Sequence, residues 1–233
     1  MKDNENRVAD YINGAKALVF DMHDTLVDAK SGYIAHNMEL AEKFGVPKTR
    51  EEVIRLYGIG DFKEMLRQLC GTDNIDEIMA VHALGKHRPE FQLQPIETIP
   101  HDLRTLRRLG YVTGVFTATT PDMLVRDLGI AGYVRDELFD FTDTVYTTGI
   151  KKSDPLSFSA TLSQLADRRI NPDQAVYVGD GLGDMQGSLG AGMRFVGIEQ
   201  GFISPEEFAE HGVLSLPGVH ELVNIIRRKH GQL

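Results

Sequence analysis

Hydrophobic residues along the chain fall into short continuous runs that alternate with amphipathic stretches. Five runs are typical of strands buried on both faces of a parallel sheet: residues 15–20, 111–116, 143–146, 175–178 and 194–198. Helix-start signals lie between them, because Thr120, Asp154 and Ser204 each precede a proline that can occupy the first helical position. Alternating strands and helices predict an α/β fold with an open, Rossmann-like parallel sheet.

The pattern changes between residues 33 and 94, where no strand-like run occurs. Four helices are predicted there: 33–44, 50–57 with Thr49 and Glu52 as a capping box, 61–70, and 75–84. Helices without a strand, placed between the first strand and the next, predict an inserted helical domain. We assign residues 31–95 to this domain and residues 1–30 and 96–233 to the α/β core, with joins near 28–32 and 92–97.

The length of 233 residues fits a core domain with a smaller insertion. With 42% hydrophobic and 25% charged residues, the composition is that of an ordinary globular protein. A net charge of −9 argues against a nucleic-acid partner. No run could span a bilayer and no signal peptide is recognisable, so we expect a cytoplasmic monomer or homodimer without a membrane partner. The single cysteine, Cys70, excludes an internal disulfide, and we interpret it as a small packed residue.

Polar side chains follow the predicted strands, and ligands in open parallel sheets bind at the carboxyl ends of strands. The first four strands are followed in turn by Asp21-Met22-His23-Asp24-Thr25-Leu26, Thr117-Ala118-Thr119, Lys151-Lys152-Ser153-Asp154-Pro155 and Gly179-Asp180-Gly181-Leu182-Gly183-Asp184. Carboxylates are the hard oxygen ligands that a divalent cation prefers, and a lysine with a hydroxyl can hold the remaining oxygens of a phosphoryl group. The sequence therefore predicts a magnesium and phosphoryl site at this edge.

Each of these residues also has a plainer interpretation when taken alone. Asp21 could be a helix cap, Thr117 a turn residue and Lys152 a solvated surface lysine. Residues 179–184 could form a loop that needs glycine. Their ordered occurrence after successive strands favours a common site. The glycines match neither the dinucleotide-binding spacing nor a P-loop.

These motifs resemble the four signature motifs of the haloacid dehalogenase (HAD) superfamily over residues 18–201, most closely its phosphoglycolate-phosphatase and β-phosphoglucomutase-like branch. The resemblance implies that Asp21 is the nucleophile, which takes the phosphoryl group as an acyl phosphate. It implies that Thr117 holds a phosphoryl oxygen and that Lys152 neutralises nucleophile and phosphate. Asp180 would bind Mg²⁺ and Asp184 would support the metal. Residues 31–95 resemble the family's mobile helical cap, and the substrate would be a small phosphorylated metabolite.

One departure from the family pattern affects the chemistry. The first motif usually reads Asp-x-Asp-Gly-Thr-Leu, whereas this chain has His23 at the second aspartate and Asp24 at the glycine. The backbone carbonyl of His23 still offers the metal ligand that the family takes from this position. Histidine has an unperturbed pKa of about 6.5 and is a competent acid and base, so His23 is our candidate acid/base. Asp24 could hydrogen-bond it or serve only in a turn.

Two other functions stay open at this point. The first is hydrolysis of a carbon–halogen or carbon–phosphorus bond; the latter would need a cap lysine, for which Lys43 or Lys63 could be suggested. The second is a non-catalytic binding protein that retains the metal site. Substrate specificity is expected to lie in the cap, which offers Lys63, Arg67, His36, His82, Lys86, His87 and Arg88.

Overall fold

The computed structural model describes residues 2–57, 62–85 and 93–232. Its internal contacts form two compact units, Met1–Asp28 with Pro95–Leu233, and Ala29–Gln94. The first is an α/β unit and the second is helical. A separate two-stranded sheet pairs β2 (Val27–Asp28) with β3 (Gln94–Pro95). Along the chain, β2 comes directly before the helical segment and β3 comes at its end.

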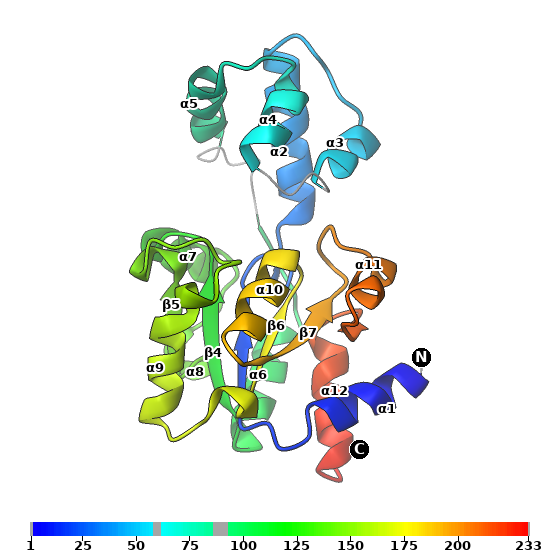
Figure 1. The fold of residues 1–233 in the computed structure, drawn as a ribbon, viewed down its shortest axis with the longest axis vertical. Coiled ribbons are helices and arrows are strands. Elements are labelled where there is room, and N and C mark those ends of the chain that lie inside the picture. Colours follow the sequence, from blue (N-terminus) through cyan, green and yellow to red (C-terminus); the bar gives the residue numbers. More distant parts are fainter. Residues whose placement is uncertain (1, 58–61, 86–92, 233) are drawn as a thin grey trace. The chain divides into compact units, whose positions relative to one another are not determined.

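The α/β unit is built on a parallel sheet of six strands in the order β5-β4-β1-β6-β7-β8 (Figure 1). In chain order these are β1 (Ala17–Phe20), β4 (Val112–Thr117), β5 (Phe141–Thr144), β6 (Ala175–Gly179), β7 (Arg194–Ile198) and β8 (Ser215–Leu216). The chain runs outward from β1 through β4 to β5, and then returns to β6 on the other side. β1 therefore borders the topological switch point, where open α/β sheets bind their ligands.

Helices cover both faces of this sheet, and Figure 1 shows α10 in front of it and α6 behind. Because helices cover both faces, every residue of β1 and β6 is buried. This burial explains why these strands are continuous apolar runs in the sequence. The α-helices are α1 (Lys2–Tyr11), α6 (Ile99–Arg108), α7 (Pro121–Ile130), α8 (Arg135–Leu138), α9 (Ser159–Asp167), α10 (Leu182–Gly190), α11 (Pro205–Glu210) and α12 (Val219–Lys229). Short 3₁₀ turns are η2 (Val145–Thr147), η3 (Pro155–Phe158) and η4 (Pro172–Gln174).

The helix-start signals are confirmed. Thr120 and Ser204 accept backbone hydrogen bonds from Met123 and Glu207 at the starts of α7 and α11. Asp154 likewise accepts from the Leu156 amide, although the element that it starts is the turn η3, ahead of α9.

The third strand begins and ends two residues earlier than predicted. Residues 143–146 were expected to be extended, but the strand is Phe141–Thr144 and the turn η2 follows. Packing decides this register, because Phe141 pairs with Gly114 and a β-carbon at Gly114 would lie 2.3 Å from the Phe141 ring. The sixth strand, β8, has only two residues and gave no recognisable pattern.

The helical unit contains α2 (Lys30–Lys43), α3 (Arg50–Leu56), α4 (Phe62–Cys70) and α5 (Ile75–Gly85). All four predicted helices are present, and the Thr49–Glu52 capping box at the start of α3 is confirmed. Helix α2 begins three residues before the predicted start. Cys70 is buried, as expected, and burial raises the pKa of its thiol to about 11.

One tyrosine of the α/β unit joins two distant chain segments. The Tyr133 hydroxyl lies 2.8 Å from the carbonyl oxygen of Leu26 and accepts a 3.1 Å hydrogen bond from the Ile96 amide. Burial raises the pKa of Tyr133 to about 12, so its hydroxyl stays protonated and can donate. Leu26 precedes β2 and Ile96 follows β3, so this one side chain fixes both connections on the α/β side.

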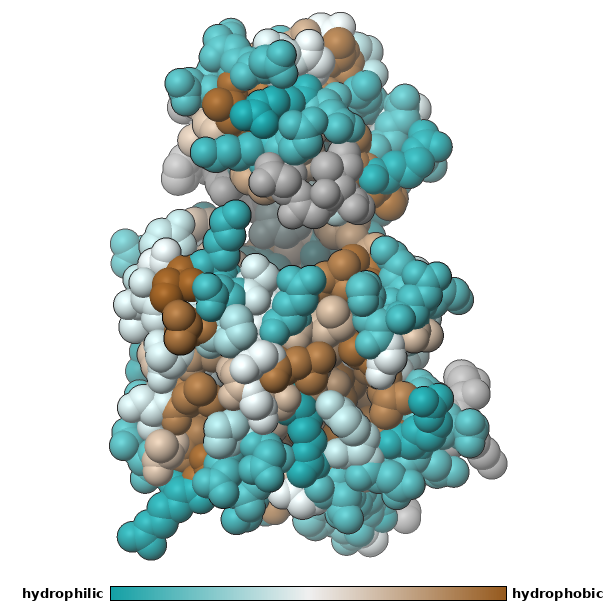
Figure 2. Space-filling view, viewed as in Figure 1, coloured by the Kyte–Doolittle hydropathy of each residue, from teal (hydrophilic) through white to brown (hydrophobic). Residues whose placement is uncertain are grey.

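The surface mixes apolar and polar residues. Figure 2 shows hydrophobic residues among hydrophilic ones on the face it presents. Large exposed apolar side chains include Val125, Ile130, Val134, Tyr146, Leu156 and Leu189. Among the described residues, no helix combines the length and the apolar character needed to cross a lipid bilayer.

Candidate active site

Three predicted site residues lie at the carboxyl ends of adjacent strands. Phe20, the last residue of β1, pairs with Val115 of β4 and Val178 of β6. Asp21 follows directly, and its amide donates a 2.9 Å hydrogen bond to the Val178 carbonyl. Thr117 ends β4 on one side, where it is almost fully buried, and Asp180 follows β6 on the other.

Lys152 lies between two of the aspartates. Its ammonium contacts a carboxylate oxygen of Asp21 and lies 2.5 Å from Oδ1 of Asp184. The rings of Tyr177 and Phe116 are also near this ammonium, with centroids 5.3 and 5.9 Å away. Burial alone would lower the pKa of Lys152, but its two carboxylate partners outweigh this and hold the pKa above its usual value. Lys152 therefore stays charged.

The carboxylates of Asp21, Asp180 and Asp184 form a compact cluster, with one oxygen of each within 4.8 Å of the others. Removal from water and neighbouring carboxylates raise the pKa of Asp180 well above its usual value. Removal from water also raises the pKa of Asp184, although Lys152 acts in the opposite direction. A divalent cation within this cluster would relieve the repulsion, because its charge exceeds that of any nearby side chain.

The backbone around the cluster leaves room for these carboxylates. A β-carbon at Gly201 would lie 2.0 Å from Oδ2 of Asp180, so only glycine allows the carboxylate its present position. The Gly181 amide donates a 3.0 Å hydrogen bond to Oδ2 of Asp184 and fixes its orientation. Hard oxygen donors held in this way fit a divalent cation such as Mg²⁺.

Helix α10 also positions the Lys152 segment. Gly187 faces that segment so closely that a β-carbon there would lie 2.1 Å from the Lys152 carbonyl oxygen. The Ser157 hydroxyl donates to the same carbonyl at 3.3 Å. One helix thus carries Asp184 in its first turn and supports Lys152 about one turn later, at Gly187.

The structure gives His23 a partner that sequence reasoning missed. Nε2 of His23 lies 2.9 Å from Oδ2 of Asp127 on α7, and Oδ1 of Asp127 lies 2.6 Å from the Arg126 guanidinium. Asp127 is completely buried and shares a helix face with Leu124 and Leu128. The sequence did contain a signal for it, because Asp127 is an acidic residue at a position of α7 where the helical spacing predicts an apolar one.

Asp24 occupies a left-handed turn with φ of 54°, and its amide donates a 2.7 Å hydrogen bond to the Val27 carbonyl. This backbone conformation suits the glycine of the family pattern, and aspartate is one of the few other residues that tolerate it. The turn role considered for Asp24 thus has direct structural support. The carboxylate is buried and belongs to the acidic surroundings of Asp180.

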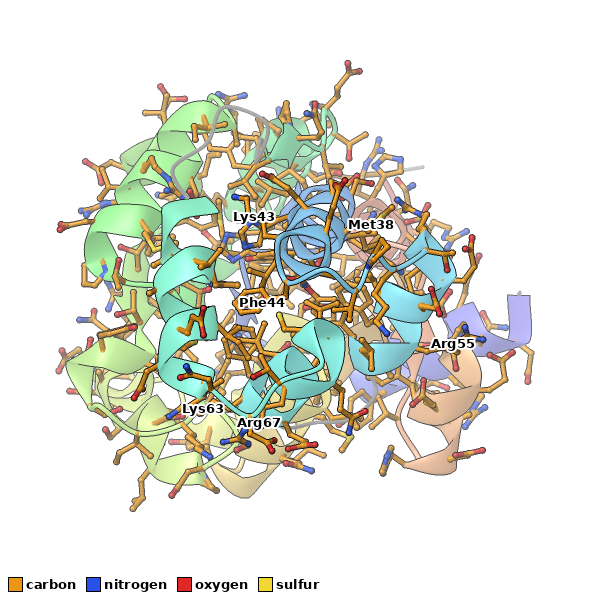
Figure 3. The ribbon with its side chains drawn as sticks, turned by 90° about the horizontal axis from the view of Figure 1, so that it is seen from above. Met38, Lys43, Phe44, Arg55, Lys63 and Arg67 are labelled. Carbon is orange, nitrogen blue, oxygen red and sulfur yellow. The ribbon has the colours of Figure 1, made fainter. Side chains whose placement is uncertain are left out.

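The specificity candidates of the helical unit differ in exposure. Lys63 is exposed on α4, and Arg67 on the same helix pairs with Glu64 at 3.3 Å (Figure 3). His36 and His82 are buried and meet edge to face, with ring centroids 4.6 Å apart. Lys86, His87 and Arg88 lie outside the described residues.

The two lysines suggested for carbon–phosphorus hydrolysis, Lys43 and Lys63, are both exposed to solvent. Lys43 lies 3.2 Å from Glu39, which is one turn before it on α2, and Lys63 is exposed. A lysine that forms a Schiff base needs a lowered pKa, which desolvation or a second cation supplies. The geometry therefore does not favour this alternative.

Comparison with known proteins identifies the family. The family described as haloacid dehalogenase-like hydrolase matches residues 18–198, and the chain therefore belongs to it. It is a hydrolase, and its parallel sheet confirms the predicted α/β fold, with six strands where the sequence had indicated five. The chain is 25% identical to N-acetylmuramic acid 6-phosphate phosphatase of Pseudomonas aeruginosa, over 91% of this chain and 95% of that protein. It is 27% identical to phosphoglycolate phosphatase of Cereibacter sphaeroides, over 91% of this chain and 97% of that protein.

Solved structures show the same fold. A hydrolase from Pseudomonas syringae superimposes with a TM-score of 0.71 at 19% identity, covering 91% of this chain and 98% of that one. CbbY from Rhodobacter sphaeroides, solved in complex with phosphate, gives a TM-score of 0.65 at 21% identity, covering 89% and 96%.

Proposed function

We propose that this protein is a magnesium-dependent phosphatase that hydrolyses a small phosphorylated metabolite through a phosphoaspartyl intermediate on Asp21. The observation that carries this proposal is the Lys152 ammonium held between Asp21 and Asp184, beside the carboxylate of Asp180. Two phosphatases of different substrates are similar to the chain over nearly its full length, which supports phosphate-ester chemistry over other reactions of the family.

The reaction has two steps. In the first, an Asp21 carboxylate oxygen attacks phosphorus, the bond to the leaving oxygen breaks, and His23 gives that oxygen a proton. In the second, His23 takes a proton from water as the water attacks phosphorus, and the acyl phosphate breaks to return free Asp21 and inorganic phosphate. Lys152 and Thr117 would hold the phosphoryl oxygens. Splitting hydrolysis in this way replaces one difficult displacement by two easier ones.

The metal ligands in this proposal are Asp21, Asp180 and the backbone carbonyl of His23, with Asp184 acting directly or through water. When bound, Mg²⁺ supplies charge that offsets the repulsion between nucleophile and phosphate. Asp180→Asn should weaken magnesium binding at least tenfold by calorimetry, because it removes a charged ligand from a cluster whose carboxylates lie within 4.8 Å. Unchanged affinity would remove Asp180 from the site.

We also propose that residues 31–95 act as the cap that selects the substrate. The helical unit has its own buried core, including Leu40, Val53, Leu66 and Leu69, so it can act as a preformed body. Exchange of this segment for that of a phosphoglycolate phosphatase should change the preferred substrate while generic aryl phosphate hydrolysis persists. A preference that stays with the α/β unit would contradict the assignment.

The decisive experiment is hydrolysis of p-nitrophenyl phosphate, with Mg²⁺ and with EDTA. We expect turnover with Mg²⁺ only, and none from Asp21→Asn. Asp173→Asn is the matched control, since Asp173 is exposed at η4, which precedes the amino end of β6 and not the carboxyl ends that carry the site. Borohydride reduction of quenched enzyme, read by mass spectrometry, should locate the acyl phosphate at residue 21. Activity that survives Asp21→Asn would overturn the proposal.

A further inference from the structure

Asp127 is a buried carboxylate for which the fold alone gives no reason. It lies on α7 between the core residues Leu124 and Leu128 and has no exposed surface. A carboxylate in such a place is costly unless charged groups and hydrogen-bond donors surround it. Both oxygens have partners here, with Arg126 at Oδ1 and His23 at Oδ2.

The contact with His23 fixes the imidazole in a particular way. A carboxylate oxygen can only accept, so Nε2 of His23 must carry the hydrogen in the 2.9 Å bond to Asp127. The proton that a catalytic imidazole exchanges would therefore reside on Nδ1. The bond also restricts rotation of the ring, and the Arg126 guanidinium holds the carboxylate from its other side at 2.6 Å.

We infer that Asp127 is a positioning residue, which orients the imidazole of His23 and fixes its tautomer for proton transfer to the leaving oxygen. This inference rests on the proposed phosphatase function. The chain has histidine where its family has an acidic residue, and the buried carboxylate supplies the orientation that an imidazole needs. The competing explanation is a structural ion pair that only anchors α7 to the loop after β1.

Asp127→Asn distinguishes the two explanations. The asparagine oxygen would remain with Arg126, and the amide group would then face Nε2 and act as a donor. His23 would have to accept there and carry its hydrogen on Nδ1, which is the tautomer change that the same substitution causes in Ser-His-Asp triads. A neutral imidazole whose only hydrogen is on Nδ1 cannot give that proton to the leaving oxygen without becoming an anion, and its Nδ1 has no electron pair with which to take a proton from water.

The measurement is kcat/KM for phenyl phosphate and p-nitrophenyl phosphate, two substrates of nearly equal shape. Phenolate is a poor leaving group that needs a proton, whereas p-nitrophenolate leaves readily without one. General acid–base help is worth about 10²–10⁴-fold, so Asp127→Asn should lower kcat/KM for phenyl phosphate about 10- to 100-fold more than for p-nitrophenyl phosphate. Asp122→Asn is the matched control, an exposed aspartate in the first turn of the same helix.

Two further readouts separate positioning from structure. In a His23→Ala background, Asp127→Asn should have no additional effect on either substrate, because the group that it orients is already gone. Nitrogen NMR of the imidazole should show the Nε2–H tautomer in the parent protein and the Nδ1–H tautomer in Asp127→Asn. The parent spectrum keeps the test valid even if the variant does not fold, since an Nδ1–H tautomer there overturns the inference.

The remaining outcomes are distinct. Equal losses on both substrates, or losses that persist in the His23→Ala background, would leave the phosphatase function standing and overturn the role of Asp127. An unchanged Asp127→Asn variant would do the same. A parent protein that hydrolyses neither aryl phosphate with Mg²⁺ would overturn the proposed function, and the positioning role with it.

Discussion

Replacing Gly187 by alanine should move the Lys152 segment without touching any charged group. The new β-carbon would lie 2.1 Å from the Lys152 carbonyl oxygen, and β-carbons in real structures essentially never come within 3.0 Å of another heavy atom. The segment must therefore move by at least 3.0 − 2.1 = 0.9 Å. Because the obstacle is backbone, with the Phe158 ring a further 2.6 Å contact, rotation of a flexible side chain cannot absorb this shift.

The magnitude follows from two opposing effects. Overpacking of this kind costs about 1–3 kcal/mol, while alanine in place of glycine inside a helix gains about 1 kcal/mol. Gly129→Ala isolates the second effect, since Gly129 is also helical and a β-carbon there meets no heavy atom of the described residues within 4 Å. Gly187→Ala should thus be less stable than Gly129→Ala by about 1–3 kcal/mol, measured by urea unfolding.

Activity should fall more steeply than stability. A displacement of about 1 Å in a positioned group can reduce turnover about 10²-fold, and Lys152 contacts the proposed nucleophile directly. We expect Gly187→Ala to lose turnover of p-nitrophenyl phosphate by about that factor, while Gly129→Ala keeps it. Equal stability and equal turnover in the two variants would refute the idea that Gly187 places Lys152.

Three further predictions concern groups whose surroundings are already defined. Lys152→Met leaves the buried carboxylates of Asp21 and Asp184 without their cation, and should lower the unfolding free energy in EDTA by about 3–5 kcal/mol; a loss below about 1 kcal/mol would contradict this. Cys70 has a pKa raised to about 11, so at pH 8 only about one thiol in 10³ is ionised. Labelling by a disulfide reagent should therefore be slow and should accelerate about tenfold per pH unit towards pH 11, whereas rapid labelling at pH 7 would be inconsistent with burial. Tyr133→Phe removes a hydroxyl that joins two chain segments and should lower the free energy of unfolding, measured with urea, by about 1–3 kcal/mol. An unchanged free energy would contradict the role of Tyr133 in joining these segments.

The sheet could be predicted because burial on both faces leaves a direct trace in the sequence. β1, β6 and β7 are continuous apolar runs, and their predicted and observed positions agree to within two residues. β5 lacks that trace, since its last three residues are Thr-Asp-Thr and the contact of Phe141 with Gly114 fixes its register instead. β8 is a two-residue strand, too short to show any periodicity.

The site divides in a similar way. Asp21, Asp180 and Asp184 follow the ends of strands or open a helix, so a topological rule was enough to expect them together. The supporting contacts are different, because they depend on which residues of later elements come near these positions. Asp127 is separated from His23 by 104 residues and stands in a helix that otherwise looks like an ordinary amphipathic element. No local pattern could have connected the two.

The two unusual residues of the first motif can be understood together with Asp127. The family pattern has an aspartate at position 23 and a glycine at position 24, whereas this chain has His23 and Asp24. The substitution therefore removes a carboxylate at position 23 and adds one at position 24. Asp24 lies in a left-handed turn, which costs an L-residue about 1–2 kcal/mol. Asp24 then adds to the negative field that raises the pKa of Asp180, which strengthens the demand for a cation. Asp127 supplies the second carboxylate, 2.9 Å from Nε2 of the imidazole. On the proposed function, the proton-transfer group has changed from a carboxylate to an imidazole that a second carboxylate holds, while the charge of the metal cluster is preserved.

His23→Asp alone would therefore bring a second carboxylate near that of Asp127, and the two would repel each other. The matching double change, His23→Asp with Asp127→Asn, should restore more activity than His23→Asp by itself.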